Sequence, residues 1–583
     1  MNEQADPSTT DGDGPAAGTP SDGGSSASPA PTRGTAKKAP AKRTAKKAPA
    51  KRTAGTAAKK APAKRAPAKS AAKKTAKKAP AKRAPAKSAA KKPPMRTTAR
   101  GLAGRAAAGK SSGPLQIGST ERRHPYRTLA ERRERGLAWR DAAPLDGMDE
   151  FDPSPSRPSP VEILRAQDGN RLTDLVPIRY GRMSTSAFAF YRGSAAVMAY
   201  DLAQQPYTPG GTQLCGDAHL SNFGFFGSPE RDLVFDVNDF DETLPGPFEW
   251  DLKRLAASVV LAGRDRGFKK KEIRAAVVGA VEGYRDAVQR LATSPNLDVW
   301  YFRVDSALIQ GAITQIARAE FGKKAVKQAE GRLDQIFSKA RGKTSLRAAQ
   351  KLTEVVDGHR QFRSDPPLLF RVVPSPEEIG FVEQVFSQYK DTLNNDRRRL
   401  LERFDFQDLA HKVVGVGSVG TRAFVVLLEG RDPDDLLVLQ VKQAAESVFE
   451  AHLRPSEYEN HGQRVVEGQR YMQAASDIFL GWARGPHNDF YVRQLHDMKG
   501  SVDLTVIQPI GLNIYSKLCG ATLARAHARG GDIVAIASYL GDDDRFAQAI
   551  ARFGEAYADQ AQQDYATLQA AIAAGDVPAE TGY

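Results

Sequence analysis

The sequence predicts a mixed α+β fold preceded by a long N-terminal tail that cannot pack. Three observations predict this arrangement. Residues 1–115 consist largely of small, charged and proline residues. Residues 408–445 alternate β-branched and aromatic residues between glycine-rich turns, which is typical of strands. Most of the chain around them has the composition and apolar spacing of helices, so we expect one small sheet region among many helices.

The tail divides into two segments. Residues 1–35 are acidic and rich in Ser and Gly, so burial cannot offset the entropy of ordering them. Residues 36–115 are rich in Lys, Ala and Pro, and residues 36–92 hold 22 Lys and Arg with no acid. Frequent proline blocks a long helix. We therefore expect both segments to be disordered.

The charge of the second segment indicates a partner. The chain carries a net charge of +17, yet the residues after the tail are slightly acidic. Dense, unopposed positive charge favours nonspecific, salt-dependent binding of nucleic acid through residues 36–110. No aromatic residue interrupts the lysines, so we do not expect stacking on bases. The segment resembles linker-histone tails, and a purely solubilising tail is the alternative.

Cysteine content and hydropathy indicate the compartment. Two cysteines, Cys215 and Cys519, argue against a disulfide scaffold. No apolar run is long enough to span a bilayer, and the acidic N-terminus does not read as a secretory signal. We expect a cytoplasmic protein, associated with the nucleoid through its tail, with no membrane partner.

The remaining elements are predicted from apolar spacing. We expect three regions: a helical lobe over 120–400 that carries a catalytic loop, a strand-rich nucleotide lobe over 405–510, and C-terminal helices over 511–583. The expected helical segments are 160–205, 250–292, 300–400, 460–482 and 512–575, and the expected strand segments are 408–445 and 488–510.

The segment that indicates a reaction most directly is residues 215–222, Cys-Gly-Asp-Ala-His-Leu-Ser-Asn. Asn222 follows Asp217 by five residues, and Asp239 comes just after an apolar strand. This spacing is typical of a kinase phosphotransfer centre. Asp217 would orient the attacking hydroxyl as a catalytic residue, and His219 is a second catalytic candidate.

The same motif predicts a magnesium site. Carboxylate and carbonyl oxygens suit magnesium, so Asn222, Asp239 and Asp241 are the candidate ligands. The alternative is structural, because a Gly-Asp-x-His run can be a turn in which the Asp caps a helix. His219 alone can equally be a packed histidine.

A glycine-rich segment at residues 415–420, Gly-Val-Gly-Ser-Val-Gly, is the candidate nucleotide-binding loop. Gly415, Gly417, Ser418 and Gly420 would cover the phosphates of ATP. Lys442, in Val-Leu-Gln-Val-Lys, resembles the strand lysine that contacts these phosphates. Its pairing glutamate would be Glu467 or Glu446, and we prefer Glu467 because it lies within a predicted helix. A dinucleotide-binding loop and a plain strand–turn–strand are the alternatives.

Residues 212–262 resemble aminoglycoside and choline phosphotransferases. Asp217, His219, Asn222, Asp239 and Asp251 match the motif of that group. The chain departs from it at one place, since a cysteine stands at 215 where those enzymes have a histidine. The resemblance implies a bilobal, protein-kinase-like fold.

The order of the motifs predicts a permuted version of this fold. In kinases the glycine-rich loop precedes the catalytic loop, whereas here it follows it. Residues 491–495 resemble a hinge strand, and residues 520–527 resemble the helix that leads into a catalytic loop. A circular permutation explains this order, and permutation is tolerated when the old termini lie close together.

Residues 120–575 resemble an uncharacterised bacterial family, domain of unknown function 2252. The resemblance rests on residues 188–193, 216–224, 238–243, 250–255, 415–422 and 524–529. The family supplies no substrate. Arg182 and Arg192 flank an aromatic run, residues 188–191, close before Asp217. They are expected to contact phosphates or the acceptor, with surface or interhelical ion pairs as the alternative.

From these motifs we expect the protein to be an ATP- and Mg²⁺-dependent phosphotransferase. It would act on an unknown hydroxyl-bearing acceptor and be tethered to nucleic acid by its tail. Nucleotidyl transfer is a variant of the same chemistry. The alternatives are a noncatalytic nucleoid-associated protein with a degenerate kinase-like body, and a dinucleotide oxidoreductase.

Overall fold

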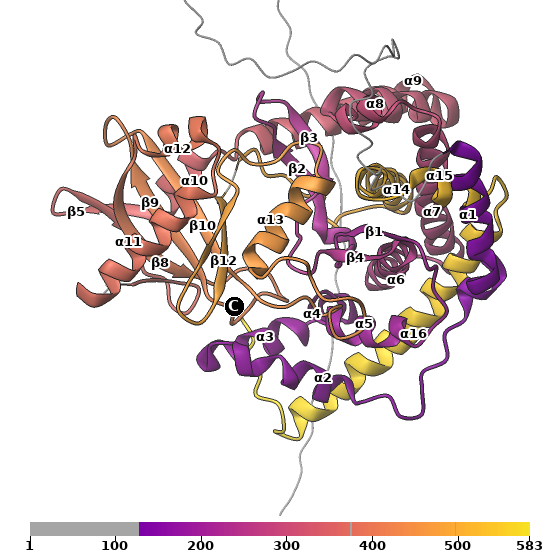
Figure 1. Ribbon diagram of the computed structural model, residues 1–583, viewed down its shortest axis with the longest axis horizontal. Coiled ribbons are helices and arrows are strands. Elements are labelled where there is room, and N and C mark those ends of the chain that lie inside the picture. Colours follow the sequence, from indigo (N-terminus) through magenta and orange to yellow (C-terminus); the bar gives the residue numbers. More distant parts are fainter. Residues whose placement is uncertain (1–127, 373–375, 496) are drawn as a thin grey trace, which may run out of the picture. The chain divides into compact units, whose positions relative to one another are not determined.

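The computed structural model describes residues 128–583, except 373–375 and 496 (Figure 1). The predicted disordered segments 1–35 and 36–115, and with them the predicted nucleic-acid contact, lie outside the described residues. Within the described residues the chain forms a mixed α+β structure, as predicted.

The largest sheet has six antiparallel strands in the order β11-β12-β10-β9-β8-β7. Its strands are β7 (Leu369–Arg371), β8 (Asp405–Lys412), β9 (Ala423–Glu429), β10 (Leu436–Ala444), β11 (Gly481–Arg484) and β12 (Asp489–Gln494). β8, β9 and β10 confirm the strands predicted over 408–445. Their register places Lys442 of β10 opposite Tyr491 of β12, which brings a lysine and a tyrosine side by side.

Three two-stranded antiparallel sheets complete the strands of the described residues. They are β1 (Gly211–Leu214) with β4 (Leu244–Pro247), β2 (Phe223–Gly227) with β3 (Leu233–Val237), and β5 (Thr353–Val356) with β6 (His359–Phe362). The loop from β1 to β2 carries the predicted catalytic motif, and the loop from β3 to β4 carries Asp239 and Asp241. The pairing of β1 with β4 therefore draws the two loops together.

The helices before the sheet include the core helix α6, which is buried along nearly its whole length. They are α1 (Leu129–Ala142), α2 (Pro160–Ala166), α3 (Val176–Met183), α4 (Ala187–Gly193), α5 (Ala195–Ala203), α6 (Phe248–Asp265), α7 (Lys270–Ala292), α8 (Asn296–Tyr301), α9 (Ser306–Arg341) and α10 (Ser345–Leu352). These confirm the helices predicted over 160–205 and 250–292.

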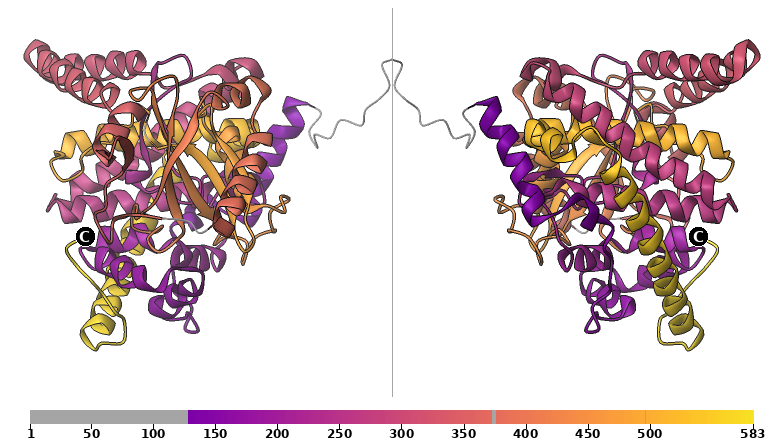
Figure 2. Two further views of the ribbon diagram at one scale, coloured as in Figure 1. Left: turned by 90° about the vertical axis from the view of Figure 1, so that its left-hand side faces the viewer. Right: turned by 90° about the vertical axis from the view of Figure 1, so that its right-hand side faces the viewer.

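The later helices are α11 (Pro376–Asp391), α12 (Asn395–Leu401), α13 (His461–Met472), α14 (Pro509–Gly530), α15 (Ile533–Leu540) and α16 (Arg545–Ala573). Of these, α13 to α16 share the core of α6, whereas α11 and α12 pack on the six-stranded sheet. α14 packs tightly on α7, because a Cβ on Gly520 would lie 1.9 Å from the carbonyl oxygen of Ala280. Figure 2 shows α16 extending along the helical part.

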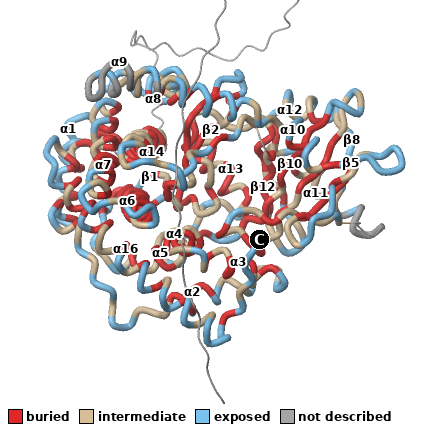
Figure 3. The backbone as a smooth tube through the Cα atoms, turned by 180° about the vertical axis from the view of Figure 1, so that it is seen from behind, coloured by how far each residue is buried: buried red, intermediate tan, exposed pale blue. Residues whose placement is uncertain are grey.

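α13 lies between the sheet and the helices (Figure 1). It contacts β11 and β12 on one side, and β1 and α14 on the other. In Figure 3 the buried backbone is concentrated in α6, α14 and the central strands, while the β5–β6 hairpin is largely exposed. No helix in the described part of the chain combines the length and the apolar character that crossing a membrane would require.

The segment 300–400, predicted as mostly helical, is mostly helical and also contains the short strands β5, β6 and β7. Two predicted boundaries were wrong. The helix predicted over 460–482 ends at Met472, and the strand predicted over 488–510 ends at Gln494. β7 adds only three residues to the sheet edge, and pairing with β8 makes it a strand. Such tertiary pairing overrides local propensity.

Candidate functional site

The segment 215–222 is held in place by its backbone. Gly216 has a φ of +84°, and a Cβ there would lie 2.2 Å from the carbonyl oxygen of Glu242. Glycine is the residue that satisfies both constraints. The carboxylate of Asp251, in the first turn of α6, accepts the N–H of Cys215 at 2.8 Å and that of Gly216 at 3.0 Å. Asp251 therefore fixes the start of the motif.

A buried chain of hydrogen bonds holds Asp251 in turn. His527 Nε2 of α14 lies 3.1 Å from Asp251 Oδ2, and His527 Nδ1 lies 2.9 Å from the hydroxyl of Tyr284 on α7. All three side chains are buried. Asp251, which the sequence matched to the phosphotransferase motif, thus holds the 215–222 loop and is itself held by the buried His527 and Tyr284.

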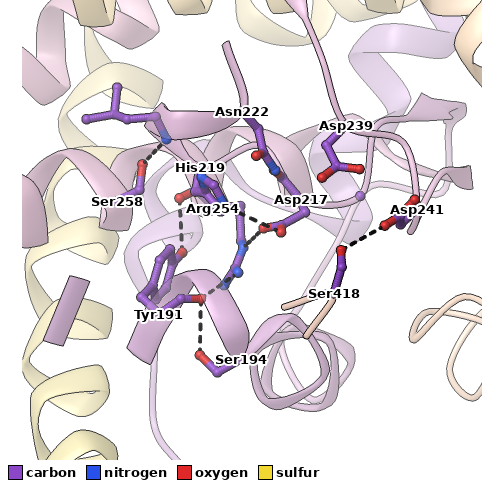
Figure 4. Close-up of polar contacts among 12 residues, drawn as sticks. Tyr191, Ser194, Asp217, His219, Asn222, Asp239, Asp241, Arg254, Ser258 and Ser418 are labelled. Atoms are coloured by element: carbon purple, nitrogen blue, oxygen red, sulfur yellow. Dashed lines mark hydrogen bonds and ion pairs between the residues drawn. The ribbon is translucent and has the colours of Figure 1, made fainter. Parts of the chain in front are cut away.

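Asp217 forms an ion pair with Arg254, which lies on α6 one turn after Asp251 (Figure 4). Arg254 Nε donates to Asp217 Oδ1 at 2.7 Å, and its guanidinium lies 4.0 Å from the centroid of the Tyr191 ring. Arg254 also donates to the Tyr191 carbonyl oxygen at 2.7 Å. Burial raises the pKa of Asp217, and the ion pair with Arg254 opposes that shift.

His219 and Asn222 lie on either side of Asp217. His219 Nε2 is 3.6 Å from Asp217 Oδ2, and its Nδ1 is buried without a hydrogen-bond partner among the described residues. Burial lowers the pKa of His219 well below its usual value, so its imidazole is neutral at pH 7. Asn222 Nδ2 donates to the Asp217 carbonyl oxygen at 2.8 Å, which leaves the amide oxygen available to another ligand.

Lys442 meets the acidic pair after β3. Lys442 Nζ lies 2.6 Å from Asp241 Oδ2 and 4.0 Å from Asp239 Oδ1. The hydroxyl of Tyr491 donates to Asp241 Oδ1 at 2.7 Å, and Ser418 Oγ donates to Asp241 Oδ2 at 3.3 Å. Asp241 is therefore engaged by three donors.

The pKa values of Asp239 and Asp241 are therefore shifted in opposite directions. Burial raises the pKa of Asp239, and the neighbouring Asp241 adds to the rise. Burial acts in the same direction on Asp241, but Lys442 and Tyr491 outweigh it and hold the pKa of Asp241 below its usual value. Oδ1 of Asp239 is buried and has no hydrogen-bond partner in the described structure. Asp239 is thus the carboxylate with an unused oxygen.

Glu467 does not pair with Lys442, and that expectation is corrected. Its Oε1 accepts from Arg470 at 2.9 Å, one turn along α13. Arg464 occupies the inward face of the helix, where its guanidinium donates to the carbonyl oxygens of Asp241 and Thr243. Glu467 is engaged by Arg470, and the carboxylates that reach Lys442 among the described residues come from the β3–β4 loop.

The glycine-rich segment lies between β8 and β9, beside the acidic pair. Gly415 and Gly420 have φ of +67° and +88°, which favour glycine. Arginines hold its carbonyls: Arg171 Nη1 donates to Gly417 O at 2.8 Å, and Arg182 Nη1 donates to Gly415 O at 2.5 Å. The loop is a shaped turn between two strands, and β9 continues directly from it as strand.

One cavity joins these parts. It has a volume of about 650 Å³, within the range of small-molecule sites. Its lining includes the side chains predicted from both motifs: Asp217, His219, Asn222, Asp239, Asp241, Gly415, Gly417 and Ser418. Two segments distant in sequence therefore face a shared space. Lys442 and Gly420 are not in the lining; Lys442 reaches the cavity through its ion pair with Asp241.

The residues present can be compared with what magnesium needs. No group of three or more His, Cys, Asp or Glu side chains suited to a metal occurs among the described residues. Magnesium commonly takes one or two carboxylates together with substrate phosphates and water. The unused oxygens of Asp239 and Asn222 fit that smaller role, whereas Asp241 is already engaged by Lys442.

Sequence reasoning missed several residues that shape the site. Arg254, Tyr491 and Glu242 were not singled out, although each contacts a predicted residue. Arg254 carried one usable signal, since it lies in an otherwise apolar core helix one turn after Asp251. The pairing of Tyr491 with Asp241 depends on strand register, which the residue pattern did not indicate.

Comparison with known proteins identifies the family. The family model described as an uncharacterised protein conserved in bacteria (DUF2252) matches residues 171–571. This range covers more than half of the chain and includes both motifs, so the chain belongs to that family. Neither a curated protein nor a solved structure matches it.

Proposed function

We propose that this protein transfers a phosphoryl group from ATP to a hydroxyl-bearing acceptor. The observation that carries the proposal is the meeting of Lys442 with Asp239 and Asp241, although the lysine and the acids lie far apart in the chain. Phosphoryl transfer depends on positioning and on neutralising phosphate charge. A buried cation beside two carboxylates at the edge of a cavity supplies the groups for both.

The residues have distinct roles in this proposal. Asn222 and Asp239 would hold Mg²⁺ on the nucleotide phosphates, and the 415–420 loop would cover those phosphates. Asp217 would orient the acceptor hydroxyl, whose oxygen attacks the γ-phosphorus while ADP leaves. The hydroxyl proton passes to Asp217, and Arg254 holds that carboxylate at a fixed position.

The proposed fold is protein-kinase-like, bilobal and circularly permuted. Two features support it: a glycine-rich turn between antiparallel strands, followed by a strand lysine, and a helix, α13, between that sheet and the helices. α14 then packs beside the start of the catalytic motif through His527 and Asp251. In a kinase-like chain permuted as proposed, this helix would follow the sheet and the catalytic loop would precede the sheet, as they do here, with α1 to α5 and α15 and α16 as additions.

The test is binding of ATP to the full chain with and without Mg²⁺. Asp239→Asn should remove the dependence on Mg²⁺ and weaken binding at least tenfold. Asp334→Asn, which makes the same change on an exposed part of α9, is the matched control and should bind as wild type. Calorimetry on both variants cancels any contribution from the tail. Equal binding by wild type and Asp239→Asn would contradict the proposal.

A second proposal concerns the tail and rests on its 22 Lys and Arg without an acid over residues 36–92. We propose that it binds nucleic acid nonspecifically. Affinity for duplex DNA should then fall steeply with salt in the full chain and be lost when residues 1–110 are removed. DNA binding without ATP binding would favour a noncatalytic nucleoid-associated protein over a phosphotransferase.

A further inference from the structure

Arg192, on α4, is a cation of the cavity that lacks a protein partner. Its Nε is buried and has no hydrogen-bond partner among the described residues, and no carboxylate in that part of the chain lies within ion-pair distance of it. Burying a charge is costly unless it is paired. An unpaired guanidinium at the wall of a cavity therefore indicates an anion that arrives with the ligand.

The other arginines near the cavity are already engaged. Arg171 donates to Gly417 O and Val419 O of the glycine-rich segment. Arg254 is held by Asp217 and by Tyr191. The Nε of Arg171 is also buried without a partner, but its Nη1 is held by two carbonyl oxygens. Arg192 differs from both in that none of its nitrogens makes a hydrogen bond within the described residues.

Arg192 lies at the Asp217 end of the cavity. It interacts electrostatically with Asp217 and with His219. The acids at the other end, Asp239 and Asp241, instead interact with Lys442 and Arg493. In the proposed phosphotransfer, Asp217 orients the acceptor, so Arg192 interacts with the residue that orients the acceptor. Its backbone lies beside the glycine-rich segment, since a Cβ on Gly417 would be 3.3 Å from the Arg192 carbonyl oxygen.

The wall beside Arg192 also suits a small molecule. The cavity continues along the start of α5, where Ala195, Ala196 and Tyr200 line it. Small side chains leave room next to the guanidinium, and Tyr200 packs edge-on against His452 at a centroid distance of 5.9 Å. A compact ligand with one anionic group fits this half-apolar wall.

We propose that Arg192 binds a phosphate or carboxylate group of the acceptor, so that the acceptor is a small hydroxyl compound that also carries an anion. Guanidinium binds both groups through two parallel hydrogen bonds. The assignment rests on the proposed function, because it takes Asp217 as the residue that orients the acceptor hydroxyl. It names the substrate class and a specificity-determining residue for the site.

The test measures anion binding by the full chain after saturation with Mg²⁺ and a nonhydrolysable ATP analogue. Inorganic phosphate and acetate are titrated separately by calorimetry, which separates a phosphorylated acceptor from a carboxylated one. Arg192→Met should weaken binding of the preferred anion at least tenfold while leaving affinity for the analogue within about twofold. Arg192→Lys, which keeps the charge but loses the paired hydrogen bonds, should give an intermediate loss.

Arg264→Met is the matched control. It removes one positive charge from α6 outside the cavity, where Arg264 pairs with Asp559, and should bind the anion as wild type does. Equal anion binding by wild type and both Arg192 variants would overturn the inference, as would a loss of analogue affinity as large as the loss of anion affinity. If wild type binds no analogue, the proposed function fails instead, and the anion arms without nucleotide still test Arg192.

Discussion

The two ends of the cavity have the same arrangement of charged side chains, with positive and negative charges exchanged. At one end Asp217 is paired with Arg254, and the cation left over is Arg192. At the other end Lys442 is paired closely with Asp241 and lies 4.0 Å from Oδ1 of Asp239, which accepts no hydrogen bond among the described residues. Each end thus contains a satisfied ion pair and one unsatisfied charged group.

This difference in charge indicates that the two ends of the cavity bind different ligands. A free carboxylate attracts a metal ion, whereas a free guanidinium attracts an anion. The paired groups beside them have fixed positions, so they orient ligands at little further cost in entropy. If this division is correct, changes to the pairs should alter stability, and changes to the free groups should alter binding.

The largest effect on stability is expected from Arg254→Met. The change leaves the Asp217 carboxylate without its cation and removes one of the donors to the Tyr191 carbonyl oxygen, which keeps the hydroxyl of Ser194 at 3.2 Å. Both Arg254 and its Tyr191 stacking partner are buried, so the free energy of unfolding should fall by about 4 kcal/mol. Urea denaturation followed by circular dichroism measures the fall.

A double mutant separates the ion pair from the lost packing. In Arg254→Met with Asp217→Asn no carboxylate is left uncompensated, so part of the stability should return. A coupling energy of about 1 kcal/mol or more is expected from the cycle. Purely additive losses would mean that Arg254 supports the loop by packing alone, and the symmetry between the two ends would be lost.

Lys442→Met should have a smaller effect on stability and a clear one on nucleotide binding. Asp241 keeps the hydroxyls of Tyr491 and Ser418, and its carboxylate is 29% exposed, so water can replace part of the lost interaction. The free energy of unfolding should fall by about 2 kcal/mol, and affinity for Mg²⁺-ATP should fall about tenfold.

Lys442→Arg is the control, because it keeps the charge beside Asp241 in a bulkier form and should retain more stability than the Met variant. Thermal unfolding and calorimetry on the two variants measure the difference. Unchanged ATP affinity in Lys442→Met would place the nucleotide elsewhere and remove the contrast between the ends.

The parts of this site that the sequence predicted are those encoded by short spacings. Asp217, Asn222 and Asp239 were predicted from their positions relative to one strand, and all three line the cavity. The glycine-rich turn and the strand bearing Lys442 were predicted from alternation over a few residues. Local geometry decides such features, so local pattern predicts them.

What the sequence did not predict depends on tertiary register. Glu467 was chosen because it lies within a predicted helix, but its carboxylate accepts from Arg470, and Arg464 is the side chain of α13 that reaches the β3–β4 loop. Tyr491 reaches Asp241 because β12 pairs with β10 in one register out of several. The strand β7 exists through its pairing with β8. None of these relations has a signature within a short window of sequence.

The smallest effect on stability is expected from a change at Glu242, which lines the cavity and interacts with an acid at each end. Burial raises its pKa to about 7, while the N–H of Val448 and the charge of Arg464 act against the rise, and Asp241 and Asp217 add to it. Between its usual pKa of 4.5 and about 7, the folded protein keeps a proton that the unfolded chain has released. The stabilising contribution is therefore complete below the unfolded pKa and is lost as the pH rises through the folded one.

Glu242→Gln fixes this side chain in a neutral form and should remove that pH dependence. The variant should match wild type at pH 5 and be more stable at pH 8 by about 1–2 kcal/mol, measured by urea denaturation at each pH. Every other titrating group is common to both proteins, so the difference reports Glu242 alone. A constant difference across the pH range would mean that Glu242 is ionised throughout. In that case a third acid would be charged between the two ends, and the balance of one free cation against one free carboxylate would no longer describe the cavity.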